Sequence, residues 1–250
     1  MSEAARRRDG RKALECKFMP CPCLRRAKGS ALRQASAFLF AAALLGLSLG
    51  SKSRADDARA SVSAIPDDVW SYMQGRSWHD GRGCPARDEL ALLRIPYRDF
   101  EGRTQLGPMI VARKVAGKVA AIFQEIYDSG DFRIYRIGLV DDYGGDDDQS
   151  IAANNTSGFN CRTTEGGGVS QHAFGLAIDI NPVQNPYVAH GVTEPEAGKA
   201  YDAPGKRHAG MVGVITKGDV VYKAFAKRGW RWGGEWARSK DYQHFSANGH

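Results

Sequence analysis

Outside its first 55 residues, this 250-residue chain has no excess of basic side chains. The formal net charge is +7, but residues 1–55 hold 12 of the 35 Lys and Arg and only 3 of the 28 Asp and Glu. The rest of the chain therefore has 23 basic and 25 acidic residues. A body without a basic surplus argues against nucleic acid as a partner.

The chain also lacks an apolar run of the length that a membrane-spanning helix needs, about 20 residues. Its longest such run, residues 35–49, follows a basic stretch. This order is typical of a secretory signal peptide, and small-residue patterns at 53–55 and 58–60 fit a cleavage site. An uncleaved signal anchor is the alternative. In both cases we expect residues 1–55 to direct the body to the periplasm or cell envelope, with membrane contact only through this segment.

Cysteine is scarce, with five residues in the whole chain. Three of them lie in the N-terminal leader, so Cys84 and Cys161 are the only two in the body. An even pair in an oxidising compartment predicts one disulfide between Cys84 and Cys161. Two unrelated buried thiols are the alternative.

The body shows no internal repeats, and hydrophobic periodicity predicts one α+β domain over 65–250, preceded by a polar linker at 56–64. The expected elements are a helix starting near Pro66, an apolar run over 90–95 ended by Pro96, a helix over 108–128, a strand over 132–140, a strand over 176–180 and a short helix over 220–228. Segments 141–168 and 182–206 are expected to be irregular, the first as a solvated acidic loop.

Two short segments carry residues suited to metal chemistry. His172 and Asp179 lie in the first, and Asp241 and His244 in the second. A catalytic zinc needs three protein ligands and an open position, with a base nearby. Asp179 stands between two isoleucines, and a buried carboxylate there is costly without a cation. The spacing alone leaves a second interpretation open, in which the histidines are structural and Asp179 pairs with an arginine.

The pattern Ser-x-His-x-x-Gly-x-Ala-x-Asp at 170–179, followed by Asp-x-x-His at 241–244, resembles the M15 family of zinc peptidases. That family includes D-alanyl-D-alanine carboxypeptidases and L-alanyl-D-glutamate endopeptidases. The run 229–245 is similar to the family's C-terminal signature, and we expect the resemblance to cover 108–246. It implies a small antiparallel sheet with flanking helices and a zinc site on the sheet, as in hedgehog and D-Ala-D-Ala peptidase-like folds.

The resemblance also implies roles for single residues. It implies Zn²⁺ held by His172, Asp179 and His244, with Asp241 as the catalytic base. An arginine is expected to stabilise the oxyanion or to bind a substrate carboxylate. Arg136 and Arg162 are the two candidates, and a structural salt bridge is the alternative for each.

Two further residues are candidates for supporting roles. Ser170 is expected to orient a metal ligand or the substrate, unless it serves only a turn. Trp232 is expected, like Trp230 and Trp236, to line a substrate groove near His244 or to pack in the core.

The resemblance implies that the substrate is a peptidoglycan stem peptide. The Asp-x-x-His motif at 241–244, rather than Glu-x-x-His, favours the L-alanyl-D-glutamate group. The segment 141–168 departs from the family's short Gly-Tyr-Arg-Ser segment, so carboxypeptidase and endopeptidase action both stay open. A catalytically inert zinc-containing binding module of the same fold, as among hedgehog relatives, is the alternative function.

Overall fold

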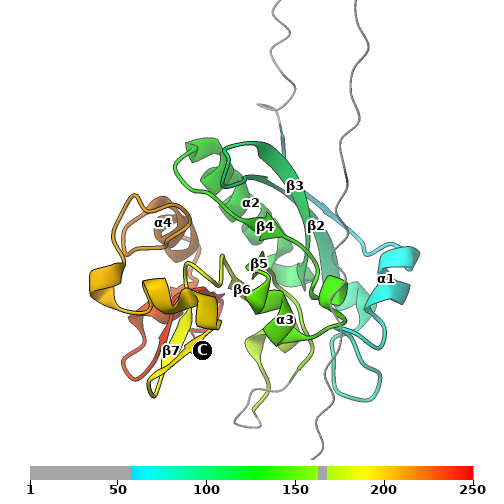
Figure 1. Ribbon diagram of the computed structural model, residues 1–250. Coiled ribbons are helices and arrows are strands. Elements are labelled where there is room, and N and C mark those ends of the chain that lie inside the picture. The colour runs from blue at the N-terminus through cyan, green and yellow to red at the C-terminus, as the bar shows by residue number, and fades with distance from the viewer. Residues whose placement is uncertain (1–57, 163–167, 250) are drawn as a thin grey trace, which may run out of the picture. The chain divides into compact units, whose positions relative to one another are not determined.

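The computed structural model of the protein describes residues 58–162 and 168–249 (Figure 1). The leader over 1–55, with its predicted export signal, lies outside the described residues. Within the described ranges, no helix combines the length and the apolar character that crossing a membrane requires.

Four α-helices and eleven short strands make up the described fold, joined by 3-10 turns. The helices are α1 (Asp67–Met73), α2 (Arg113–Ser129), α3 (Asp147–Ala152) and α4 (Val220–Ala226). The strands are β1 (Ser61–Ser63), β2 (Leu90–Arg98), β3 (Thr104–Ala112), β4 (Arg136–Ile137), β5 (Asn155–Thr156), β6 (Ala177–Asp179), β7 (Tyr187–Ala189), β8 (Val192–Glu194), β9 (Arg231–Trp232), β10 (Lys240–Asp241) and β11 (His244–Ser246).

The strands form three small antiparallel sheets and one parallel pair. The antiparallel orders are β1-β2-β3, β10-β7-β8 and β6-β11-β9, and β4 pairs with β5 in parallel. Helix α2 packs on the first sheet and contacts α4 (Figure 1). One core joins α2, α4 and the β6–β11 pair through Phe123, Phe225, Ile178 and Phe245, all at most 1% exposed. The predicted mixture of small antiparallel sheets and a few helices is therefore confirmed.

The helix predicted over 108–128 begins later, because residues 104–112 form strand β3. Residues 109–112 are all buried and form a continuous apolar run. Helical spacing alone does not distinguish such a run from the first turns of the amphipathic helix α2 that follows it. Pro108 is tolerated because β3 is an edge strand of its sheet, where a missing N–H breaks no ladder. Pro96 likewise does not end β2. Since β1 pairs only with residues 92–94, Pro96 has no partner on that side of β2 that would need its missing N–H.

The strand predicted over 132–140 is mostly wrong. Only Arg136 and Ile137 pair as strand β4. The preceding backbone N–H groups do not donate to a neighbouring strand of a regular ladder. The N–H of Ile134 donates to the Arg98 carbonyl at 2.9 Å, and the N–H of Tyr135 donates to Asn181 Oδ1 at 2.8 Å. The partly alternating burial of residues 132–140 therefore does not require a long β-strand.

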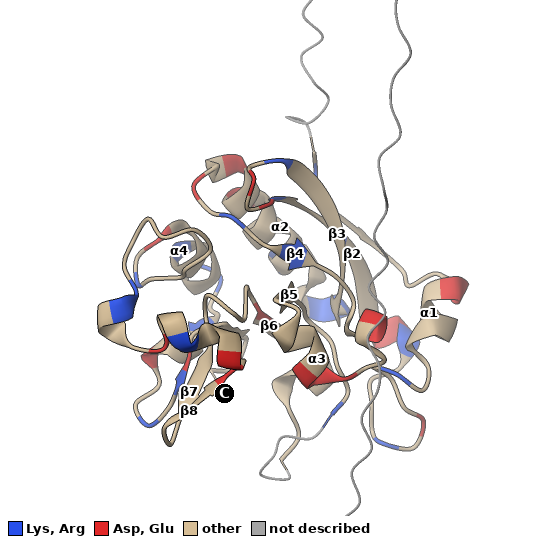
Figure 2. Ribbon diagram, viewed as in Figure 1, with Lys and Arg blue, Asp and Glu red and all other residues tan. Residues whose placement is uncertain are grey.

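The acidic segment 141–168 is not simply an irregular, solvated loop. It contains α3 and β5 within its described part, and Asp141 is 3% exposed and accepts from the Ser77 N–H at 3.1 Å. Asp146 caps α3 by accepting from the Gln149 N–H, and two further acids occupy the first helical turn (Figure 2). Carboxylates at a helix N-terminus were a readable signal for this helix.

The predicted disulfide is present between Cys84 and Cys161, with Cα atoms 5.8 Å apart and a sequence separation of 77. It ties the loop after α1 to the segment that leads into the candidate site. Because the loop is long, chain entropy predicts roughly 4–5 kcal/mol of stabilisation.

We expect the double variant Cys84→Ser/Cys161→Ser to unfold at clearly lower urea concentration than the oxidised wild type. Adding reductant should lower the wild-type midpoint towards that of the variant, whose own midpoint should not respond. An unchanged wild-type midpoint under reduction, with free thiols verified, would contradict a stabilising bridge.

Candidate metal centre

Strands β6 and β11 bring two of the predicted ligands together. The antiparallel register pairs Asp179 with His244 and Ile178 with Phe245. Since successive strand residues face opposite sides, Asp179 and His244 share one face while the apolar pair enters the core on the other. The local alternation therefore dictates that the two polar side chains meet.

The three predicted ligands converge on one point. His172 Nε2 lies 3.1 Å from Asp179 Oδ2 and 3.3 Å from His244 Nδ1, and His244 Nδ1 lies 3.1 Å from Asp179 Oδ1. Ligand atoms about 2.0–2.1 Å from a tetrahedral zinc lie about 3.3 Å from one another. All three residues are at most 7% exposed. Their donor types and spacing fit a zinc ion.

His172 is oriented by its neighbours in the 3-10 turn η4 (Gln171–Phe174). Ser170 caps this turn, with its hydroxyl accepting from the His172 N–H at 3.2 Å. The His172 Nδ1 lies 2.6 Å from the Gly158 carbonyl, which can only accept. Nδ1 therefore carries a proton, and Nε2 is the ring nitrogen that faces the cluster and is placed to bind a metal.

Asp179 is an ionised carboxylate in a buried place. Burial raises its pKa, but the imidazoles of His172 and His244 more than offset that effect and hold the pKa well below its usual range. Its backbone is fixed by two 3.0 Å hydrogen bonds with Ser157. The Asp179 carboxylate is therefore ionised and can bind a cation.

Asp241 reaches the site from a different sheet, because β10 pairs with β7 and sets Asp241 opposite Tyr187. A Cβ at Gly233 would lie 2.8 Å from the Asp241 Cβ, so only glycine allows this approach. Burial raises the pKa of Asp241 to about 7, with the charges of His244, Asp179 and His172 also acting on it. Its Oδ1 is buried and has no hydrogen-bond partner among the described residues. Such an acceptor is suited to take a proton from water.

The cluster opens into a cavity of about 480 Å³ that also takes in Asp241 and Arg162. Arg162 Nη2 forms an ion pair with Asp147 Oδ2 at 2.5 Å, and the adjacent Cys161 is held by the disulfide. Of the two predicted arginines, Arg162 is the one that lines this cavity.

Arg136 and Trp232 lie away from the metal cavity. Arg136 lies on β4, which pairs with β5 and not with the sheet of β6 and β11. It lines a separate cavity and donates to the Tyr143 hydroxyl at 2.9 Å. Trp232 is 7% exposed in the core, and its Nε1–H donates to the Tyr242 carbonyl. Trp236 lines the metal cavity instead, 5.5 Å from His244 between ring centroids.

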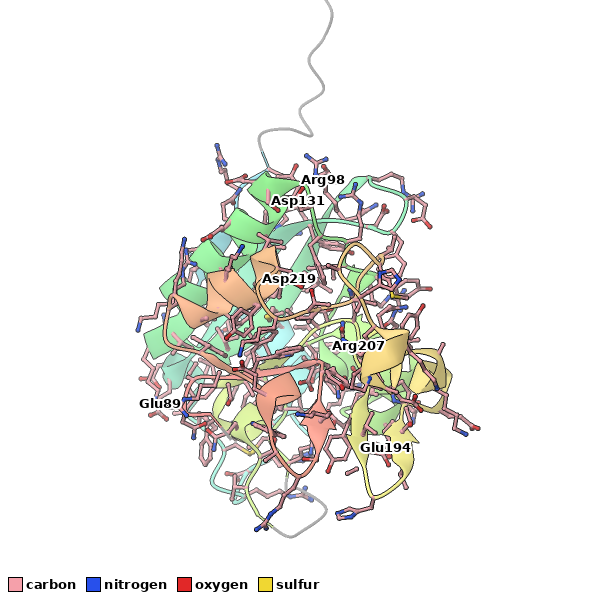
Figure 3. The ribbon with its side chains drawn as sticks, turned by 90° about the vertical axis from the view of Figure 1, so that its left-hand side faces the viewer. Glu89, Arg98, Asp131, Glu194, Arg207 and Asp219 are labelled. Atoms are coloured by element: carbon pink, nitrogen blue, oxygen red, sulfur yellow. A yellow bond between two sulfur atoms is a disulfide. The ribbon has the colours of Figure 1, made fainter. Side chains whose placement is uncertain are left out.

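Sequence reasoning missed one wall of the cavity, the β7–β8 hairpin, which it assigned to a loop. Tyr187 and Glu194 are cross-strand partners on this hairpin, and both line the cavity. Glu194 is labelled in Figure 3. His190 and Gly191 both have positive φ, the conformation that a two-residue hairpin turn requires. Such turns favour Asn-Gly and Asp-Gly, so His-Gly gave a weak signal.

Arg207 was also missed and supports the Asp241 segment. Arg207 is labelled in Figure 3. Its guanidinium stacks over the Tyr242 ring at 3.9 Å and donates to four oxygens, including Asn185 Oδ1 at 2.8 Å. Burial lowers the pKa of Arg207 to about 10. A cation held this way fixes Tyr242, the neighbour of Asp241.

Comparisons with known proteins agree with this site. Residues 163–247 match the family model described as D-alanyl-D-alanine carboxypeptidase. No curated protein and no solved structure matches the chain. The matched segment begins later than the expected 108–246 but contains both motifs and all four residues of the cluster and its base. The resemblance predicted from the motifs is thus confirmed over residues 163–247.

Proposed function

We propose that this protein is an exported zinc peptidase of hedgehog/D-Ala-D-Ala peptidase-like fold that hydrolyses peptide bonds in peptidoglycan stem peptides. The proposal includes both D-Ala-D-Ala carboxypeptidase and L-Ala-D-Glu endopeptidase action. The observation that carries it is the buried His172–Asp179–His244 cluster beside Asp241, inside a segment that matches a carboxypeptidase family.

The four residues divide the work of hydrolysis. His172, Asp179 and His244 would hold the metal, which when bound acidifies its water ligand to a pKa of about 7 and polarises the scissile carbonyl. Asp241 takes a proton from the attacking water through its unpartnered Oδ1 and later delivers it to the leaving amine. The Gly158 carbonyl holds the proton on His172 Nδ1 throughout.

Arg162 is the cation available to the substrate in this cavity. Its guanidinium is offered to a developing oxyanion or to a substrate carboxylate, both of which a planar fork of N–H donors binds well. The ion pair with Asp147 keeps the side chain positioned.

The disulfide supports the proposed export. A bridge such as Cys84–Cys161 persists in oxidising compartments and is rare in the cytosol. Together with the predicted leader, it favours the periplasm or cell envelope, where stem peptides occur.

A matched pair of variants tests the enzyme against an inert zinc module. His172→Ala should lose stoichiometric zinc and all hydrolysis, because it removes a ligand. Asp241→Ala should keep zinc and lower kcat by about 10²–10⁴-fold, because it removes the base. Zinc is measured by atomic absorption and hydrolysis by mass spectrometry of digested muropeptides, which also identifies the bond cut. Zinc-loaded wild type that leaves muropeptides unaltered would favour the inert module.

The raised pKa of Asp241 predicts a pH-dependent stability in the zinc-free protein. Its folded pKa of about 7 exceeds the unfolded value near 3.8, so the protonated acid favours folding. That stabilisation is complete below pH 3.8 and is lost as pH rises through about 7. We expect Asp241→Asn to raise the zinc-free melting temperature relative to wild type at about pH 8, with a smaller difference at about pH 5. A difference independent of pH would contradict this assignment.

Arg162→Ala should lower kcat/KM for a stem peptide by about 10²-fold, as expected for the loss of one charged donor. Zinc content should not change, since Arg162 is not a ligand. Arg94→Ala, an exposed strand arginine outside the cavity, is the control. Equal kcat/KM in the Arg162→Ala and Arg94→Ala variants would show that Arg162 does not bind the substrate.

A further inference from the structure

A second cavity, of about 550 Å³, lies apart from the metal centre and has no role in the proposed hydrolysis. It forms where β4 meets β5 and the adjoining ends of β2 and β3. Its lining is almost entirely polar, and Ile137 is the one aliphatic side chain in it. Among the described residues that line it are three tyrosines and two side-chain amides, namely Tyr97, Tyr135, Tyr143, Gln105 and Asn155.

The charged groups in this cavity are largely satisfied by one another. Asp99 pairs with Arg103 at 2.7 Å, and Arg103 pairs with Glu101 at 2.8 Å. Asp142 accepts from the Tyr72 hydroxyl at 3.2 Å. Three carboxylates in one lining disfavour an anion, and two arginines disfavour a cation or a metal ion. The charge balance therefore favours a neutral polar ligand.

Three side chains remain available to such a ligand. The Tyr135 ring is 49% exposed and is held edge-on to Phe100 with centroids 5.4 Å apart. Arg136 is exposed, with the Tyr143 hydroxyl as its hydrogen-bond partner. Asn155 is 1% exposed and donates through Nδ2 to two groups, while its Oδ1 has no partner within the described part of the chain. An aromatic face, a donor fork and a fixed acceptor suit a ring bearing hydroxyl and amide groups.

The cavity is within reach of the metal centre. β4, β5 and β6 follow one another towards α3 (Figure 1). Asn155 stands two residues before Ser157, which pairs with the metal-site residue Asp179. At about 3.3 Å per residue and about 5 Å between strands, the Cα atoms of Asn155 and Asp179 lie roughly 8 Å apart. A lining residue of this cavity and a ligand of the metal centre are therefore close in space.

We propose that this cavity binds N-acetylated saccharide units of the glycan strand to which a stem peptide is attached. The identity of the glycan rests on the proposed peptidase function, since stem peptides reach the enzyme joined to such strands. A peptide is a poorer fit, because peptide side chains are usually held in apolar pockets, and Ile137 is the one aliphatic side chain in this lining.

Binding is tested with a peptide-free ligand, the β-1,4-linked tetramer of N-acetylglucosamine, by calorimetric titration of the full zinc-loaded chain. We expect saturable binding that Tyr135→Ala and Arg136→Ala each weaken about tenfold, because each removes a contact that the ligand uses. Both residues are exposed, so the variants should keep the wild-type melting temperature. Arg94→Ala, on an exposed strand position, is the control.

A hydrolysis arm adds a second readout. Tyr135→Ala should raise KM for glycan-attached stem peptide and leave kcat/KM for the free stem peptide unchanged. Absence of saccharide binding at millimolar concentration would overturn the proposal. Wild-type affinity in the Tyr135→Ala and Arg136→Ala variants would overturn it as well. Binding of inorganic phosphate without saccharide would also overturn it. Because the tetramer has no peptide bond to cleave, its binding is judged independently of whether the metal centre hydrolyses anything.

Discussion

The constraint on which the site depends is the burial of one carboxylate. Asp179 is 5% exposed and stands between Ile178 and Ile180, which are fully buried in the core. A carboxylate in such a place is costly unless charged or donor groups face it. His172 and His244 supply those groups at 3.1 Å. A divalent cation at the same point would neutralise the carboxylate further. The same groups that make the burial of Asp179 tolerable would therefore also bind the metal.

The candidate base is held by separate means. β10 belongs to the sheet with β7 and β8, while the ligands belong to the sheet with β6 and β11. Tyr242 joins the two short strands β10 and β11 and is held by Arg207 at 3.9 Å. This division lets Asp241 approach the cluster without sharing its hydrogen bonds, which leaves the buried Oδ1 open.

The segment 141–162 lies between two cavities and contributes to both. Asp147 and Arg162 pair within the metal cavity, while Asp142 and Asn155 line the other. Ser150 connects them by accepting from Asn155 Nδ2 at 3.0 Å from within α3. The disulfide at Cys161 anchors the end of this segment. A substrate that bridges peptide and glycan chemistry would contact one continuous stretch of chain.

The sequence indicated the metal cluster, because His172, Asp179 and His244 lie in two motifs that resemble those of a zinc peptidase family. It also determined the disulfide, since the body offers only one pair of cysteines. Only the tertiary structure decided that Arg162 rather than Arg136 faces the metal cavity, that Trp232 packs in the core, and that residues 104–112 form a strand. Those outcomes depend on which distant backbone each segment pairs with, and local periodicity carries no information about a partner far away in the chain.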